Sequence, residues 1–242
     1  MIEEMNGIIL HEIDYGETSK ILTILTKEKG IVSVISKGCK NLKSSLRSVS
    51  EKMTYGVFQI YYKENKLSIL SDVDVINNFK NIKKDIYKIS AASYLLDLTN
   101  QVVKENTKNI FDILISALIK IEENFDVKSI INIVELKYLD NLGVLPVLDS
   151  CAICGDKTSI ITISGNSGGY LCKNCRTNEL IVSDKTIKLI RMYYYVDISK
   201  IENLNISSEI KKEIDNFLTE YYEKYTGIYL KTKEFLRRIE NG

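Results

Sequence analysis

Four of the five cysteines in this 242-residue chain fall in two short pairs, Cys151 with Cys154 and Cys172 with Cys175, and seventeen residues separate the pairs. A C-x2-C turn brings two sulfurs to one side of a tight loop. Two such turns that face each other form the tetrahedron of thiolates that Zn²⁺ takes in structural sites. Four cysteine ligands leave no position for water or substrate, so the spacing predicts a zinc ion that holds a local fold and takes no part in catalysis.

Other uses of paired cysteines fit the sequence less well. Disulfides are typical of secreted proteins, whereas the first five residues, Met-Ile-Glu-Glu-Met, are acidic and run into a strand-like segment, so no secretory signal is expected. A thioredoxin-type redox motif uses one C-x2-C pair rather than two. A short β-like run at 160–163 and nearby turn glycines predict a zinc ribbon or knuckle of about thirty residues that depends on its metal. Cys39 stands alone and is expected to be an ordinary buried or half-buried thiol.

The single histidine, His11, argues against several classes of enzyme. Neither the H-E-x-x-H motif of zinc proteases nor the H-x-E motif of zinc deaminases occurs. The glycine-rich phosphate-binding loops G-x-x-x-x-G-K-[ST] and G-x-G-x-x-G are also missing. A serine triad would have to use His11, which lies in an alternating pattern and is expected to be a strand residue. The sequence therefore favours a binding protein over an enzyme.

Positive charge is unevenly distributed along the chain. The net charge is only +1, but residues 18–66 hold ten Lys and Arg against three acidic residues. Such an excess is typical of a phosphate-binding surface, although the solvated face of a lysine-rich sequence would look the same. The candidate residues for contacts with the phosphates of a nucleic acid are Lys20, Lys37, Lys40, Lys43, Arg47, Lys63 and Lys66.

The first third of the chain reads as β structure. Runs of β-branched and aromatic residues at 7–13, 21–26, 31–36, 55–62 and 67–71 predict five short strands, with a polar hairpin tip at 63–66. Five strands in about seventy residues predict a small closed barrel, of which the OB-fold is the common five-stranded form. The basic loop 37–47 lies between the third and fourth strands. OB-folds bind single strands with loops of this kind and with the exposed barrel face.

After residue 78 the apolar residues recur at helical spacing. One helix is expected from about Ile82 to Val103, and another spans about 228–239. Other helix starts and stops are marked by capping and turn residues, namely Thr107, Asp126, Gly143, Ser183 and Ser207 or Ser208. Tyrosines at 193–195 and 221–222 could stack on bases, but aromatic residues at helical spacing usually face a core, which is the interpretation favoured here.

These patterns predict an α+β protein with three parts. An N-terminal OB-fold β-barrel occupies residues 1–79, and an α-helical bundle occupies 80–147 and 182–242. A zinc-ribbon-like insert with the four cysteines, residues 148–181, interrupts the bundle. No apolar run reaches the roughly 18 residues that a membrane span needs, so a soluble protein is expected. The free-thiol zinc ligands predict a cytoplasmic protein.

The order of these parts resembles the RecO family of bacterial recombination mediators. Residues 14–23 (Asp-Tyr-Gly-Glu-Thr-Ser-Lys-Ile-Leu-Thr) are similar to the family's opening segment, and Glu-Lys-Gly at 28–30 and Ser-Lys-Gly at 36–38 match its pattern. Asn-Leu-Gly-Val-Leu-Pro at 141–146 and Gly-Gly-Tyr-Leu-Cys at 168–172 resemble its approach to zinc. The similarity covers nearly the whole chain. Cys-Lys-Asn at 39–41 departs from the family, where small residues and arginine are commoner, and lysine lacks the bidentate fork of arginine.

The resemblance implies a non-enzymatic role in the RecF pathway of DNA repair and homologous recombination. Proteins of this family bind single- and double-stranded DNA and anneal complementary strands. With RecR they help to load recombinase onto DNA coated with single-strand DNA-binding protein, and they contact the acidic C-terminal tail of that protein. A cytoplasmic, nucleoid-associated location and a structural Zn²⁺ follow from the same resemblance.

A zinc-containing OB-fold protein that binds RNA is the competing interpretation, since RNA binders also combine stacking with backbone contacts. A zinc hydrolase is the least favoured, because it needs a metal-bound water that four thiolates would displace.

Overall fold

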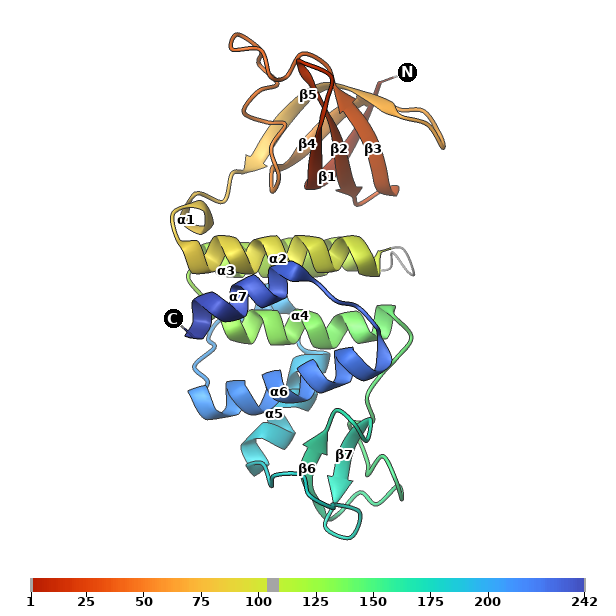
Figure 1. The fold of residues 1–242 in the computed structure, drawn as a ribbon, viewed down its shortest axis with the longest axis vertical. Coiled ribbons are helices and arrows are strands. Elements are labelled where there is room, and N and C mark those ends of the chain that lie inside the picture. The colour runs from red at the N-terminus through yellow and green to blue at the C-terminus, as the bar shows by residue number, and fades with distance from the viewer. Residues whose placement is uncertain (1, 104–108, 242) are drawn as a thin grey trace.

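The computed structural model describes residues 2–103 and 109–241, so the predicted cap Thr107 lies outside the described residues. The chain forms three parts along its longest axis (Figure 1). A β-barrel lies at one end, a layer of helices forms the middle, and a two-stranded module lies at the far end. This arrangement confirms the predicted α+β fold with an N-terminal barrel, a helical part and a cysteine-bearing module.

The barrel closes in the strand order β1-β2-β3-β5-β4, which is the order of an OB-fold. Its strands are β1 (Ile2–Tyr15), β2 (Ser19–Thr26), β3 (Gly30–Ser36), β4 (Tyr55–Tyr61) and β5 (Ser68–Asn77). Neighbours are antiparallel except β3 and β5, which meet in a short parallel pairing. The inward side chains that fill the barrel are Met5, Ile9, Leu22, Ile24, Val32, Val34, Phe58, Ile60, Leu70 and Val73. All five predicted strands are present, and β1 and β5 are longer than expected because their polar ends still pair with β4.

The helical part is built from α1 (Lys80–Lys83), α2 (Ile86–Val102), α3 (Ile110–Glu122), α4 (Val127–Asn141), α5 (Asp184–Tyr195), the 3-10 turn η1 (Ile198–Lys200), α6 (Ser208–Tyr225) and α7 (Lys231–Asn241). The predicted caps Asp126 and Ser183 are confirmed, since their side chains accept hydrogen bonds from the N–H groups of Ser129 (2.8 Å) and Thr186 (3.1 Å). Ser207 precedes α6, but its side chain makes no capping bond.

The single helix expected from Ile82 to Val103 is wrong, because the chain breaks it into α1 and α2. The Asp85 carboxylate caps α2 by accepting from the N–H groups of Tyr87 (2.9 Å) and Lys88 (3.1 Å). The break rotates Ile86 out of the predicted apolar stripe, and it is 65% exposed.

One strand of the barrel, β1, also contributes side chains to the apolar core of the helices. In β1 the side chain of Ile9 fills the barrel, while those of Ile8 and Leu10 join the cluster formed by α2, α3 and α4. This explains why the run is buried throughout instead of alternating. Tyr55 at the start of β4 stacks on Phe79 with ring centroids 6.4 Å apart. The barrel is therefore fixed against the helices by continuous packing.

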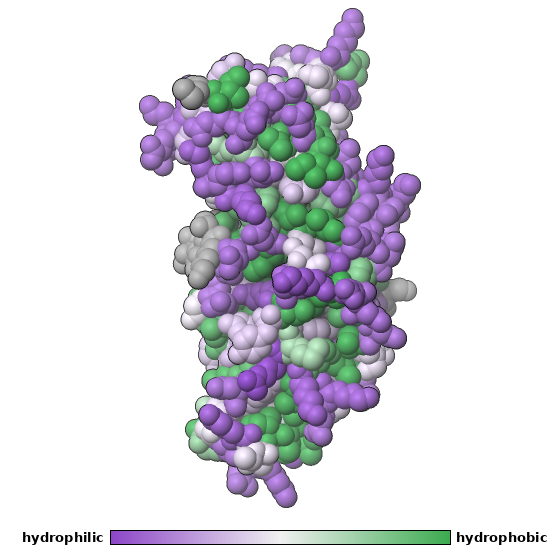
Figure 2. Space-filling model, turned by 180° about the vertical axis from the view of Figure 1, so that it is seen from behind, coloured by the Kyte–Doolittle hydropathy of each residue, from purple (hydrophilic) through white to green (hydrophobic). Residues whose placement is uncertain are grey.

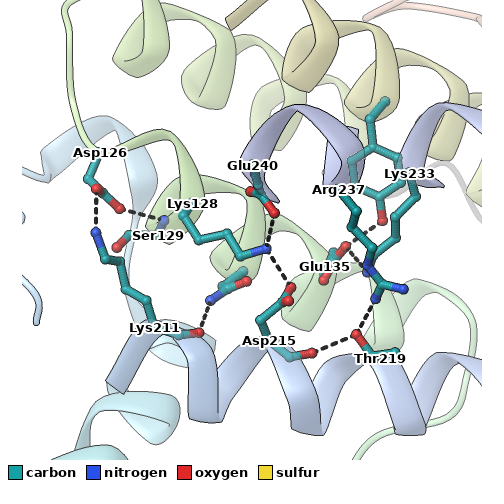
Figure 3. A network of polar contacts seen from close by, with 12 residues as sticks. Asp126, Lys128, Ser129, Glu135, Lys211, Asp215, Thr219, Lys233, Arg237 and Glu240 are labelled. Carbon is teal, nitrogen blue, oxygen red and sulfur yellow. Dashed lines mark hydrogen bonds and ion pairs between the residues drawn. The ribbon is translucent and has the colours of Figure 1, made fainter. Parts of the chain in front are cut away.

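Ion pairs join the C-terminal helix α7 to α4, in addition to the packing of its buried Leu236 (Figure 3). Lys233 Nζ lies 2.6 Å from Glu135 Oε1 of α4, and Lys128 Nζ lies 3.0 Å from Glu240 Oε2 and 2.9 Å from Asp215 Oδ1. Glu135 is fully buried and also accepts from the Tyr94 hydroxyl. Burial raises the pKa of that hydroxyl well above its usual range, so Tyr94 remains a hydrogen-bond donor.

The module at the far end is a hairpin of β6 (Ile160–Ser164) and β7 (Gly169–Cys172). Gly165, in the turn that follows β6, touches α6 so closely that a Cβ atom there would collide with Glu220. Glycine is therefore required where the hairpin meets the helices. Among the described residues, none of the helices has the length and apolar character to cross a lipid bilayer.

Candidate nucleic-acid surface and metal centre

The four paired cysteines converge as the spacing predicts. Their Sγ atoms all lie within 4.8 Å of one another, and those of Cys154 and Cys172 are 3.6 Å apart. Tetrahedral coordination with metal–sulfur bonds of about 2.3 Å places sulfurs about 3.8 Å apart. The four residues therefore fit a closed thiolate metal centre, and no other group of potential metal ligands of this kind is found in residues 2–103 and 109–241.

Local backbone bonds shape the two turns that present the sulfurs. Gly155, at φ 77°, donates its N–H to the carbonyl of Cys151 at 2.9 Å, and Arg176 donates to the carbonyl of Cys172 at 3.0 Å. The Asp156 carboxylate accepts from Thr158 and Ser159, and the bond from the Ser159 hydroxyl contributes most to lowering the pKa of Asp156 to about 2. The loop that leads from the first cysteine pair into β6 is thus held by its own side chains.

The thiols differ in acidity. Burial acts to raise the pKa of Cys151, but backbone N–H groups, first that of Cys154, donate to its sulfur and lower the pKa to about 6. The pKa of Cys175 is raised to about 12, chiefly by its hydrogen bond with the Cys154 sulfur. A divalent cation would favour the thiolate form of all four and release protons on binding. Cys39 is buried and apart from this centre, as predicted.

Lys20 and Lys40, two of the predicted DNA-binding residues, form ion pairs with β1. Lys20 Nζ lies 2.8 Å from Glu12 Oε1 and donates to the Ser50 carbonyl at 3.4 Å, and its side chain is only 19% exposed. Lys40 Nζ lies 2.8 Å from Asp14 Oδ2. Lys20 is in phase with Leu22 and Ile24, the inward residues of β2.

The other five predicted residues are exposed and make no ion pair with any described residue. Lys37, Lys43 and Arg47 lie on the loop between β3 and β4, and Lys63 and Lys66 lie at the tip between β4 and β5. The β3–β4 loop rests on the β1–β2 turn, because Lys40 N–H donates to Thr18 O at 2.9 Å and Gly38 N–H donates to Ser19 Oγ at 3.2 Å. In Figure 1 this loop projects from the end of the barrel that is distant from the helices.

The charge excess counted along the sequence is not an excess over the whole barrel. Residues 1–79 contain ten Lys and Arg and also ten Asp and Glu. Acidic residues outside the counted window pair with half of the cations, namely Glu3 with Lys29, Glu12 with Lys20, Asp14 with Lys40, Asp97 with Lys52 and Asp112 with Lys27. The remaining positive charge is concentrated on the β3–β4 loop and the β4–β5 tip. The candidate phosphate-binding surface is therefore limited to these two segments.

The two tyrosine clusters contain both buried and exposed residues. Tyr193, Tyr221 and Tyr222 are buried in the helical core, which confirms the favoured interpretation for them. The core interpretation is wrong for Tyr195, whose side chain is 70% exposed at the end of α5. His11 is an exposed residue of β1, as predicted.

A second surface escaped the sequence analysis. Lys188 and Arg191 line a shallow pocket on α5 together with Met192 and Tyr195. Met192 is 61% exposed, so an apolar side chain stands in solvent in the same pocket as two cations. Spacing of three and four residues along α5 could have indicated a common face, but not that this face remains uncovered. The face of the molecule in Figure 2 likewise shows apolar patches among mostly hydrophilic side chains.

Comparison with known proteins covers both halves of the chain. The family model described as Recombination protein O N terminal matches residues 1–79, and Recombination protein O C terminal matches residues 83–234. A DNA repair protein RecO of Bacillus pumilus is 33% identical over 246 residues, which cover 100% of this chain and 96% of the relative. Its counterpart in Bacillus cytotoxicus is 34% identical over 245 residues, covering 99% and 98%. Because the two family models cover both halves of the chain and these relatives match it over nearly their whole length, the chain belongs to the RecO family.

Proposed function

We propose that this protein is a non-enzymatic mediator of DNA repair and homologous recombination in the RecF pathway, acting in the cytoplasm at the nucleoid. Its full-length similarity to proteins named DNA repair protein RecO supports the role in repair and recombination. The observation that carries DNA binding is a group of exposed cations on an OB barrel that form no ion pair with any residue of 2–103 and 109–241, namely Lys37, Lys43 and Arg47 on one loop and Lys63 and Lys66 on a hairpin tip.

These five residues contact phosphates in this proposal. Lysine and arginine neutralise the backbone of single- or double-stranded DNA without reading its sequence. Two complementary strands held at one such surface repel each other less, which promotes annealing. Lys20 and Lys40 support the surface indirectly, since their ion pairs with Glu12 and Asp14 hold the β2 end and the β3–β4 loop in place.

The protein partners are RecR, with which it loads recombinase, and single-strand DNA-binding protein. The acidic C-terminal tail of the latter fits the α5 surface, where Lys188 and Arg191 flank exposed Met192 and Tyr195. Opposite charge and an apolar contact are the two features that an acidic tail with apolar residues would use. This surface lies on the helices, apart from the phosphate-contacting loops of the barrel.

The metal is Zn²⁺ in this proposal, held by Cys151, Cys154, Cys172 and Cys175. Four thiolates in a tetrahedron suit Zn²⁺, and the closed coordination sphere gives it a structural role. The hairpin of β6 and β7 is too small to be stable without such a brace.

The test is an annealing assay with complementary DNA oligonucleotides, free or coated with single-strand DNA-binding protein. The wild type is expected to accelerate annealing in both conditions, and a variant with glutamate at positions 37, 43 and 47 is expected to lose most of the acceleration. Binding to DNA and RNA strands of equal sequence is measured in parallel. Absence of annealing together with preference for RNA would instead identify an RNA-binding protein.

A further inference from the structure

The four clustered thiols differ in their access to solvent. Cys151 and Cys172 are buried, Cys175 is half-buried, and Cys154 is exposed. The thiolate is both the form that binds a metal and the form that reacts with oxidants, and exposure decides which thiolate an oxidant reaches first. Within the centre, Cys154 is therefore the sulfur that is open to oxidation from solution.

A second sulfur lies within reach of Cys154. The Sγ atoms of Cys154 and Cys172 are 3.6 Å apart, and a disulfide bond is about 2.05 Å long, so the two sulfurs need to approach by only about 1.5 Å. Cys154 belongs to the first cysteine pair and Cys172 ends β7. A bond between them would join the two turns that otherwise meet through the metal.

The module has little else to hold it together. The apolar cluster inside its described part consists of Cys151, Leu171 and Cys172, two of which are metal ligands. Ile163 and Tyr170 of the hairpin are instead buried against the helices. A change at the centre therefore affects both the small core of the module and its contact with the helical part.

The hairpin supports α5 directly. The Tyr170 hydroxyl of β7 donates to the carbonyl oxygen of Ile187 in α5. The N–H of Val182, in the segment that leads into α5, donates to the carbonyl oxygen of Ile161 in β6 at 3.3 Å. Ile187 is followed by Lys188, which lines the α5 pocket. The pocket is thus built on a helix that the cysteine module holds in place.

We propose that Cys154 is a peroxide-sensitive site, and that its disulfide with Cys172 releases the metal and loosens the support of α5. The inference rests on the Zn²⁺ of the proposed function and extends it. In this scheme the centre is a reversible redox switch for the α5 surface as well as a structural brace.

The oxidant is hydrogen peroxide. The Cys154 thiolate attacks one peroxide oxygen, the O–O bond breaks, and a sulfenic acid and a hydroxide ion form. The Cys172 thiolate then attacks the sulfenic sulfur, so that the S–S bond forms while the S–O bond breaks and a second hydroxide leaves. Each sulfur has lost one electron, the peroxide has gained two, and the hydroxide ions take protons from solvent to form water. Cys151 and Cys175 alone are too few ligands for a four-coordinate structural site.

Zinc release is the first measurement. Reduced full-length protein is analysed for zinc and then treated with hydrogen peroxide in the presence of a chromophoric chelator. We expect release of the bound zinc, a peptide map in which Cys154 is linked to Cys172, and recovery of binding after dithiothreitol and added zinc. A chain purified without zinc would refute the metal of the proposed function, and this inference with it. A zinc-loaded chain that keeps its zinc, or a disulfide that does not join these two residues, would overturn the inference alone.

A substitution that keeps the metal tests the role of Cys154. Cys154→His supplies an imidazole ligand for zinc but no sulfur, so release by peroxide is expected to be slower by about tenfold or more. Cys39→Ala, which alters a buried thiol outside the centre, is the matched control and should release zinc as the wild type does. Equal rates in Cys154→His and wild type would contradict the proposal. If Cys154→His does not retain zinc, the peptide map of the wild type decides.

Hydrogen exchange tests the connection to α5. After oxidation, the backbone amides of residues 180–195 are expected to exchange faster, because the module no longer holds the segment and the helix. Exchange in α3, which does not contact the module through these bonds, should stay unchanged, and dithiothreitol with zinc should restore the original rates in α5. Unaltered exchange in α5 after complete zinc release would overturn the connection between the centre and this helix.

Discussion

Lys233 of α7 and Glu135 of α4 form an ion pair whose Nζ and Oε1 atoms are 2.6 Å apart, inside the helical part of the protein. Glu135 has no exposure to solvent, so the lysine is the cation that compensates its charge. Removing one partner of a buried pair leaves an uncompensated charge, which costs about 3–5 kcal/mol. The C-terminal helix therefore contributes to stability through this buried ion pair as well as through its buried Leu236.

Lys233→Met is expected to lower the free energy of unfolding by about 3–5 kcal/mol, as measured by urea denaturation. The double variant Lys233→Met, Glu135→Gln should recover much of this loss, because the glutamine still accepts from Tyr94 without carrying a charge. Lys200→Met, which removes an exposed pair with Asp197, is the control and should change stability by less than about 1 kcal/mol. A loss in Lys233→Met no larger than in this control would contradict the role of the buried pair.

The cap of α4 should make stability depend on pH. Burial acts to raise the pKa of Asp126, but hydrogen bonds from Lys211 and Ser129 prevail and lower it below its usual value. A carboxyl group with a lowered pKa in the folded state stabilises the fold above its unfolded pKa of about 4, and this stability is lost as the pH falls through the folded value. Asp126→Asn keeps a capping side chain but cannot titrate. The stability difference between wild type and Asp126→Asn is therefore expected at pH 7 and should shrink below about pH 4; a difference that is constant from pH 7 to pH 3 would exclude this linkage.

Metal removal should unfold the cysteine module and leave the barrel folded. Purified protein is expected to contain one Zn²⁺ per chain, and Cys154→Ser should reduce both the zinc content and the melting temperature. Affinity for single-stranded DNA should change little in the protein that remains folded, because the barrel and the cysteine module lie at opposite ends (Figure 1). Cys39→Ala is the control for zinc content, since Cys39 is apart from the cluster. Full zinc content in Cys154→Ser would disprove the assignment of ligands.

Charge reversal should distinguish the two kinds of barrel lysine. Glutamate at 37, 43 and 47 is expected to weaken DNA binding and to flatten the dependence of log K on log salt, by about 0.7 per lost phosphate contact on single strands. Lys20→Gln should instead lower stability with little effect on the salt slope, because Lys20 is paired with Glu12. The result that contradicts this division is a salt slope that falls as much in Lys20→Gln as in the triple variant.

The α5 surface gives a separate binding prediction. Arg191→Glu is expected to weaken binding of a peptide with the acidic tail sequence of single-strand DNA-binding protein about tenfold, and to leave affinity for oligo-dT unchanged. Lys212→Glu on α6, an exposed residue outside the α5 pocket, is the matched control. Fluorescence anisotropy of the labelled peptide measures both, and equal effects of the two substitutions would show only a general electrostatic contribution.

The sequence allowed accurate prediction where the signal is local. The spacing of Cys151, Cys154, Cys172 and Cys175 is enough to predict their convergence, because each turn fixes two sulfurs. Asp126 and Ser183 were predictable as caps for the same reason. The capping role of Asp85 was missed. Apolar residues continue at helical spacing on both sides of it, among lysines, and this hides the break between α1 and α2.

Properties that depend on strand register could not be read from the sequence. The pairing of Lys20 with Glu12 requires knowledge of how β1 and β2 are aligned, and a count of charges along the chain treats Lys20 and Lys37 alike. The neighbouring positions of Ile13, Ile21 and Ile35 have the same origin, since these residues are separated in sequence and meet only through two strand pairings. Register is set by the packing of a whole sheet, which no short window of sequence contains.

The shared core of β1 and the helices has a mechanical consequence. Ile8 and Leu10 belong to the same packed cluster as α2, so a movement of the barrel against the helices would have to break this packing. A DNA strand bound to the barrel and a peptide bound to α5 would therefore be kept at a constant separation and angle.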